Sequence, residues 1–192
     1  MDFGWIMDTF FALFAFTLII LMVPGFAMLE AGLVRTKNVT TVLTVNTMIY
    51  IVASLMFFFI GYNLAFGGWD GSGMSMYAAF LFQMAFVGKT VNIISGGVSE
   101  RTKIIPLFIF TIFMAGFIYP LIVNITWGAN FLENTILDIS SMHDLAGSTV
   151  IHSTGGWALL AAILIIGVIG LVCDWGLMKL GERMFTWKVG AK

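Results

Sequence analysis

The sequence predicts an all-α, polytopic helical membrane protein that crosses a bilayer about five times. Of its 192 residues, 60% are hydrophobic and only 10% are charged, whereas a soluble domain carries roughly a quarter charged residues. Five apolar runs reach the length of about 20 residues that a helix needs to cross the hydrocarbon layer. A chain of this composition has too little polar surface for water, so lipid must be its solvent.

The five predicted spans follow one another with short connections. They cover residues 5–29, 39–66, 76–97, 104–125 and 149–170. The first run does not have the pattern of a cleavable signal peptide. Asp2 and Asp8, instead of Lys or Arg, stand at its start, and the run is too long for the apolar region of such a peptide.

The basic residues predict which ends of the spans face the cytoplasm. Eight of the nine lie in the connections after spans one and three or after span five, namely Arg35, Lys37, Arg101, Lys103, Lys179, Arg183, Lys188 and Lys192. The N-terminus, residues 67–75 and residues 126–148 contain none. Because loops rich in Lys and Arg stay in the cytoplasm, we expect the N-terminus outside and the C-terminus inside. The sequence shows no signal for an internal organelle, so we expect a plasma or inner cell membrane.

Composition divides the chain into a membrane domain, residues 1–170, and a tail, residues 171–192. After Gly170, charged residues such as Asp174 and Lys179 interrupt the apolar pattern. An uninterrupted helix through the tail would measure about 55 Å at 1.5 Å per residue, more than the ~30 Å hydrocarbon layer. We therefore expect the tail to enter the cytoplasm or to lie on the membrane surface.

The spacing of reactive residues excludes several classes of function. A single cysteine, Cys173, permits no internal disulfide, and the two histidines and ten acidic residues show no zinc, haem or phosphate-loop pattern. The basic residues form no stripe that would fit nucleic acid. We expect no metal, no cofactor, no nucleic-acid partner and no enzyme activity.

Polar side chains within the spans are the functional candidates, because a charged one costs about 2.5–3.5 kcal/mol in lipid unless it has a partner. They are Glu30, Asn46, Gln83, Lys89, Asn92, Asn124, Asp144 and His152. Asp144 precedes the fifth run, where a carboxylate either caps the helix or serves a site. His152 lies two turns deeper on nearly the same face, as a packing residue or as an imidazole that accepts and passes a proton.

Two aromatic residues have both a structural and a functional interpretation. Trp127 ends the fourth span on the side predicted to be external, where tryptophan usually anchors the chain at the interface. Its ring could instead hold a cation. Phe86 lies within the third span, either as a core residue or beside a pore.

Lys89 is the one basic residue inside a span. It follows Phe86 by three positions and precedes Ile93 by four, which puts all three on one helix face. If Phe86 faces a pore, Lys89 does too, roughly halfway through the membrane. The alternatives are an ion pair with Glu30 or Asp144, and a side chain that reaches out to the interface.

Several segments resemble the ammonium transporter/Rhesus (Amt/Rh) family. They are VPGFAMLEAGLVRTKNV (23–39), IGYNLAFG (60–67), LFQMAF (81–86), ISGGVSER (94–101) and DLAGSTVIHSTGGW (144–157). They occur in the family's order between residue 10 and about residue 167. The resemblance implies the fold of the family's first five spans, which form one of two inverted repeats.

The resemblance also implies roles for single residues. Trp127 matches a tryptophan that recruits ammonium by cation–π contact, and Asp144 matches a buried aspartate that supports this recruitment. Phe86 matches a phenylalanine that gates the pore. His152 matches one of two touching histidines that relay the proton, so that neutral NH3 crosses a pore that excludes potassium and sodium. The family further implies a homotrimer.

Two departures from the family bear on transport. Nothing in the chain matches the second pore histidine, for which His143 cannot substitute, and the second gating phenylalanine and a recruiting serine are missing too. Lys89 replaces a small residue, and its amine mimics and repels the substrate. The sequence predicts a partial ammonium/ammonia transporter-like protein. The alternatives are a non-conducting ammonium sensor or regulatory subunit with Lys89 blocking the pore, and a structural fragment without ligand.

Overall fold

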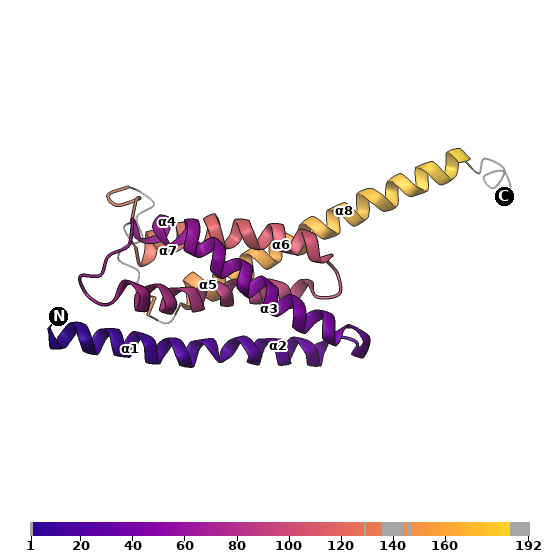
Figure 1. Cartoon of the computed structure of the whole chain (residues 1–192). Helices are drawn as coiled ribbons and strands as arrows, with labels where there is room; N and C mark the ends of the chain where they lie inside the picture. The colour runs from indigo at the N-terminus through magenta and orange to yellow at the C-terminus, as the bar shows by residue number, and fades with distance from the viewer. Residues whose placement is uncertain (1, 129, 136–143, 146, 185–192) are drawn as a thin grey trace.

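The computed structural model describes residues 2–128, 130–135, 144–145 and 147–184, so His143, Lys188 and Lys192 lie outside the described residues. Every regular element of this part of the chain is helical (Figure 1). Five segments are long and apolar enough to cross a membrane: Phe3–Leu33, Thr36–Phe66, Met76–Val98, Ile104–Thr126 and Ser148–Gly181. The predicted all-α fold with five spans is confirmed.

Each span is built from one to four helical elements. The first contains α1 (Phe3–Ile20) and α2 (Met22–Leu33), and the second contains η1 (Thr36–Asn38), α3 (Val39–Met56), η2 (Phe57–Gly61) and α4 (Tyr62–Phe66). The third is α5 (Met76–Val98), the fourth contains α6 (Ile104–Phe113), η3 (Met114–Ile118) and α7 (Tyr119–Thr126), and the fifth contains η4 (Ser148–Ser153) and α8 (Thr154–Met184). The segments η2, η3 and η4 are π-helical turns, which often occur at functional sites.

α5 is the central helix of the bundle and packs against α1, α3 and α8. Glycines bring its neighbours close, as in other membrane helices. A Cβ added to Gly88 would overlap the ring of Tyr50 on α3, and one added to Gly155 of α8 would lie 3.1 Å from the Cβ of Ile93. This packing fixes the part of α5 that carries Phe86 and Lys89.

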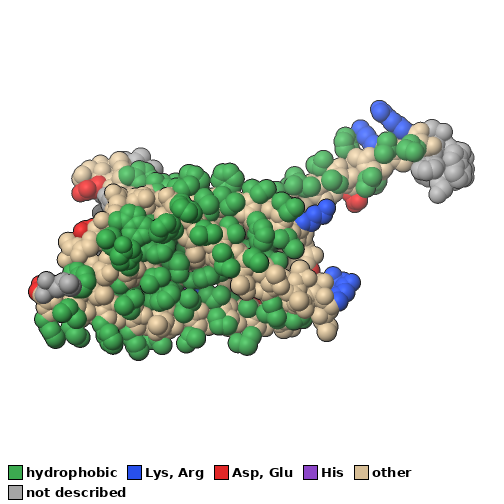
Figure 2. Space-filling view, viewed as in Figure 1, with side chains coloured by type: hydrophobic (Ala, Val, Ile, Leu, Met, Phe, Trp, Pro, Cys, Tyr) green, Lys and Arg blue, Asp and Glu red, His purple; other side chains and the backbone are tan. Residues whose placement is uncertain are grey.

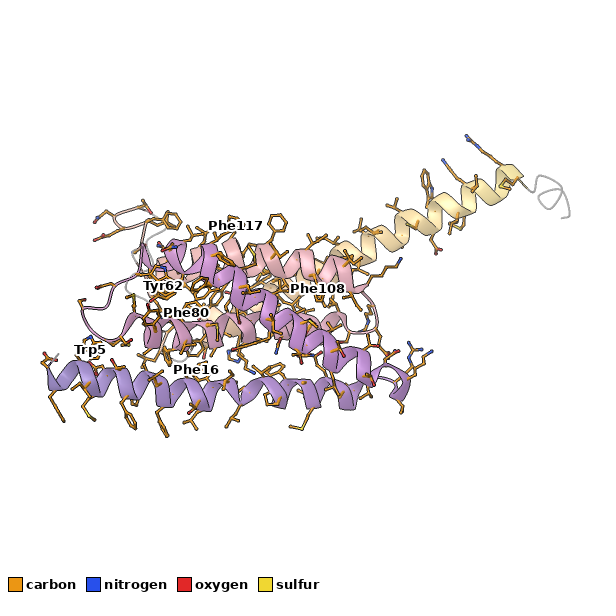
Figure 3. The ribbon with its side chains drawn as sticks, in the orientation of Figure 1. Trp5, Phe16, Tyr62, Phe80, Phe108 and Phe117 are labelled. Carbon is orange, nitrogen blue, oxygen red and sulfur yellow. The ribbon has the colours of Figure 1, made fainter. Side chains whose placement is uncertain are left out.

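Aromatic rings fill the bundle where α4 ends and α5 begins (Figure 3). The ring centroid of Tyr62 lies 5.7 Å from that of Phe80 and 4.5 Å from that of Trp69. At the same end, the Nε1 of Trp5 donates a hydrogen bond of 2.9 Å to the carbonyl of Gly71, which ties α1 to the loop before α5. These contacts pack the helices together at this end of the bundle.

The surface supports a membrane setting. Figure 2 shows hydrophobic side chains over the length of the bundle, while the visible Lys and Arg side chains gather at one end and on the far part of α8. The orientation of the two ends in a cell membrane stays a prediction.

α8 continues through Gly170 to Met184 without a break, and its C-terminal half projects beyond the bundle (Figure 1). Its 31 residues correspond to about 47 Å at 1.5 Å per residue. The division of the chain into a membrane domain and a tail at residue 170 stays a prediction, because no change of structure marks that position.

Candidate functional site

The carboxylate of Asp144 caps the start of η4. Its Oδ1 accepts hydrogen bonds from the backbone N–H groups of Gly147 and Ser148, and its Oδ2 accepts from those of Thr149 and Val150, at 2.8–2.9 Å. Gly147 has a φ of 80°, a left-handed conformation that glycine adopts without steric cost. The chain can therefore fold back over the carboxylate, and the capping interpretation of Asp144 describes its contacts in the structure.

These hydrogen bonds also determine the charge of Asp144. Burial raises the pKa of the carboxyl group, but the four backbone N–H donors favour the ionised form and bring the pKa below its ordinary value of 3.8. Asp144 therefore carries a negative charge at neutral pH, at the end of the fourth and fifth spans where Trp127 lies.

Trp127 stands directly beside this cap, at the end of α7. Its indole Nε1 donates a hydrogen bond of 2.7 Å to the backbone carbonyl of Asp144. Its ring centroid lies 6.1 Å from that of Phe86 on α5, and Phe86 contacts Phe82 edge-to-face at 5.0 Å. Because the indole N–H is already bonded, the half-buried ring has only its face left to offer a ligand.

A cavity of about 290 Å³, which we call the Lys89 cavity, adjoins this aromatic pair. Its lining residues are Ile19, Met22, Phe86, Lys89, Ile151 and His152. The structure thus brings Phe86, Lys89 and His152 together, although they come from the third and fifth spans. Trp127 reaches the cavity only through its contact with Phe86, and Asp144 does not line it.

His152 is oriented by the backbone of the capping turn. Its Nδ1 lies 3.2 Å from the carbonyl oxygen of Gly147. A carbonyl oxygen only accepts hydrogen bonds, so this contact places the proton of the neutral ring on Nδ1 and leaves a lone pair on Nε2. The imidazole, exposed at the cavity, therefore has the acceptor that a proton relay requires.

Lys89 is almost completely buried, with 3% of its surface exposed. Its Nζ lies over the ring of Phe26 on α2, 4.7 Å from the centroid. Within the described part of the chain, this amine has neither a hydrogen-bond partner nor an ion pair with Glu30 or Asp144. The ion-pair alternative for Lys89 is therefore not realised, and the aromatic face of Phe26 is its polar contact.

The contribution of the first span was not predicted from the sequence. Ile19 and Met22 line the Lys89 cavity, and Phe26 holds the amine of Lys89. Glu30 follows four residues later and lies in a different cavity. The spacing of three, four and four residues puts all four side chains on one helix face, and this periodicity was the signal that could have identified them.

The site offers an aromatic face, an imidazole lone pair and a fixed amine. Among the described residues, no group of three or more His, Cys, Asp or Glu side chains is arranged to hold a metal ion. The aromatic face can attract a small cation, and the imidazole can accept a proton from it.

The chain is similar to ammonium transporters in sequence. The profile of the Ammonium Transporter Family matches residues 10–170. Ammonium transporter Amt2 of Archaeoglobus fulgidus is 32% identical over 185 residues, which cover 86% of this chain and 38% of that protein. Ammonium transporter Amt1 of Methanocaldococcus jannaschii is 34% identical over 167 residues, which cover 83% of this chain and 42% of that protein.

The fold agrees with this similarity. A solved structure named "Sensor Amt Protein" matches 85% of this chain and 45% of its own with a TM-score of 0.71 and 26% sequence identity. The chain spans about two fifths of the length of these two curated relatives. The resemblance predicted from the sequence motifs is confirmed: the chain belongs to the ammonium transporter family.

Proposed function

We propose that this chain recruits ammonium at Trp127 and passes it as ammonia to the Lys89 cavity. The observation that carries this proposal is the cavity itself, which unites Phe86 and His152 beside a tryptophan whose N–H is already bonded. The relatives' names, ammonium transporters, support the choice of substrate. The family resemblance likewise supports a homotrimer in a plasma or inner membrane.

Recruitment at Trp127 has a simple physical basis. A cation over a tryptophan face gains about 0.5–2 kcal/mol, and more as water is removed. The ionised carboxylate of Asp144, whose backbone carbonyl holds the indole N–H, adds a favourable field. Asp144 acts here by positioning the ring and by its charge, because its carboxylate oxygens are already bonded to backbone N–H groups.

Proton transfer to His152 explains how selectivity would arise. An ammonium ion stripped of water is costly in an apolar cavity. If the ion gives its proton to the Nε2 lone pair of His152, the remaining NH3 is small and neutral and enters the cavity past Phe86. Potassium and sodium have no proton to give, so they stay charged and excluded.

The alternative function is a non-conducting ammonium sensor or regulatory subunit. The buried amine of Lys89 in the same cavity favours it, because a fixed cation in a poorly screened space repels an incoming one. The similarity to the solved structure named "Sensor Amt Protein" supports this alternative as well. In this case recruitment at Trp127 persists while permeation does not.

A flux assay in liposomes tests whether this chain conducts ammonium by itself. We expect the full chain to pass little or no ammonium, because Lys89 obstructs the cavity and no residue matches the family's second pore histidine. Because no residue matches the second pore histidine, Lys89→Ala should not restore full transport either. Robust, saturable flux from the unmodified chain would overturn both inferences, and absence of any methylammonium binding would overturn the recruitment proposal.

A further inference from the structure

Glu30 lies in the last turn of α2, apart from the Lys89 cavity, and only 4% of its surface is exposed. Its Oε2 accepts a hydrogen bond of 2.7 Å from the Nδ2 of Asn46. The hydroxyl oxygens of Ser95 and Ser99 lie 2.9 Å from Oε1 and 3.3 Å from Oε2. All three partners are uncharged.

The oxygens around Glu30 outnumber the protons available to them. The hydroxyl of Ser95 is also 2.9 Å from the carbonyl of Asn92, and that of Ser99 is 2.9 Å from the carbonyl of Ser95. A hydroxyl has one proton, so each serine that donates to the backbone turns a lone pair toward the carboxylate. The Oδ1 of Asn46, which is completely buried, has no partner among the described residues.

No basic side chain within the described residues neutralises Glu30. The ion pair at this end of the bundle joins Arg35 to Glu100, which also accepts a hydrogen bond from Asn38. Removing a carboxylate from water without a counter-ion costs several kcal/mol. The surroundings of Glu30 therefore favour neutralisation of its charge, either by a proton or by the binding of a positively charged group.

Two cavities of about 180 and 430 Å³ meet at Glu30 and share Ser99 and Glu100 in their linings. The larger one is also lined by Arg35 and Arg101, which are exposed at the end of the bundle where basic side chains gather (Figure 2). Glu30 is thus accessible from the end opposite Trp127. Either cavity is large compared with the ~30 Å³ that a water molecule occupies in the liquid.

We propose that Glu30 forms a second cation site, entered from the basic end of the bundle, and that its ligand is ammonium. The ion has four N–H donors, and the carboxylate of Glu30 and the hydroxyl oxygen of Ser99, which line both cavities, offer it acceptors. Ammonium directs N–H groups at these oxygens, whereas potassium is attracted by its charge alone, so we expect ammonium to bind better. The choice of ammonium rests on the proposed function, whereas the site rests on the contacts of Glu30.

Methylammonium binding to the purified full chain in nanodiscs tests this site. Trp127→Leu removes binding at the proposed outer site. The methylammonium binding that remains is compared with that of the double variant Trp127→Leu/Glu30→Gln. We expect Glu30→Gln to weaken the remaining binding by about tenfold or more. Asp174→Asn, which neutralises an exposed carboxylate on α8, is the matched control and should leave it unchanged. Ammonium should displace the probe at lower concentration than potassium does.

The outcomes separate this site from the proposed outer one. If Trp127→Leu has no effect while Glu30→Gln weakens binding, the Glu30 site stands and recruitment at Trp127 is wrong. If no binding remains in Trp127→Leu, or if Glu30→Gln leaves it unchanged, the Glu30 site is wrong. Equal displacement by potassium contradicts the assignment of ammonium. Where Glu30→Gln does not fold, Ser99→Ala decides instead: weaker remaining binding supports the site, and unchanged binding overturns it.

Discussion

The indole Nε1 of Trp127 donates its hydrogen bond to the backbone carbonyl of Asp144, at 2.7 Å. The carboxylate of the same aspartate caps η4, which carries His152. One residue therefore positions both the proposed recruiting ring and the start of the helix with the proposed proton acceptor. Substitutions of Asp144 should therefore lower the stability of the packing between Trp127 and η4, and should affect substrate binding through this loss rather than through a direct contact.

Asp144→Asn should destabilise the chain by about 1–2 kcal/mol, the usual effect of losing a helix cap. The amide has a single acceptor oxygen, so it cannot bond all four N–H groups that the carboxylate now serves. Thermal melting in detergent, followed by circular dichroism, measures the loss. Asp174→Asn, on the exposed face of α8, is the control and should melt like the unmodified chain. Equal melting of both variants would contradict the capping role.

The stabilisation by Asp144 should depend on pH. Its pKa in the folded chain is lowered from the ordinary value of 3.8, because the four backbone donors outweigh the effect of burial. The stabilisation is therefore complete above that value and is lost as the pH falls through the folded-state pKa. The difference in melting temperature between the unmodified chain and Asp144→Asn should be largest near about pH 6 and should shrink below the ordinary pKa. A difference that is independent of pH would contradict this linkage.

Lys89→Met should preserve the fold and strengthen methylammonium binding. A buried amine without an ion-pair partner contributes little stability, and an apolar chain of similar length fills its space. Lys179→Met is the matched control, because Lys179 also lies over an aromatic ring, that of Trp175, at 4.2 Å but outside the cavity. Melting temperature and binding are measured together. A lower melting temperature in Lys89→Met, with methylammonium affinity unchanged, would mean that Lys89 is a structural residue.

Fusions to the two ends of the chain test the orientation predicted by the basic residues. A reporter before Met1 should be external and a reporter after Lys192 should be cytoplasmic, because eight of nine basic residues lie on one side of five spans. Protease protection in intact cells and in permeabilised cells provides the measurement. Two reporters on the same side would contradict the orientation.

The number and type of the spans could be predicted because the bilayer imposes one simple rule, a long apolar helix for each crossing. The limits of individual elements could not. The π-helical turns η2, η3 and η4 and the continuation of α8 beyond Gly170 depend on packing and on hydrogen bonds between distant residues. Periodicity within one helix contains no information about these contacts.

The candidate site, too, could be predicted only in part. The spacing from Phe86 to Lys89 predicts a shared face, and both residues line one cavity. The roles of Trp127, Asp144 and His152 stay predictions drawn from family resemblance. The contact between Lys89 and Phe26 was not predicted, because the spacing within the first span marks a shared face but does not show that this face meets α5 across the bundle. The carboxylate of Glu30 was recognised as costly, but its three neutral partners come from other elements.

The most direct test of the account is methylammonium binding by the full chain with Trp127→Leu, measured in the Glu30→Gln background so that only the outer site contributes. Trp5→Leu is the control, because the indole of Trp5 also donates to a backbone carbonyl at the same end of the bundle. We predict that Trp127→Leu weakens binding by about tenfold or more and that Trp5→Leu does not change it. Unchanged binding in Trp127→Leu would contradict recruitment by this ring and leave Trp127 as an interfacial anchor.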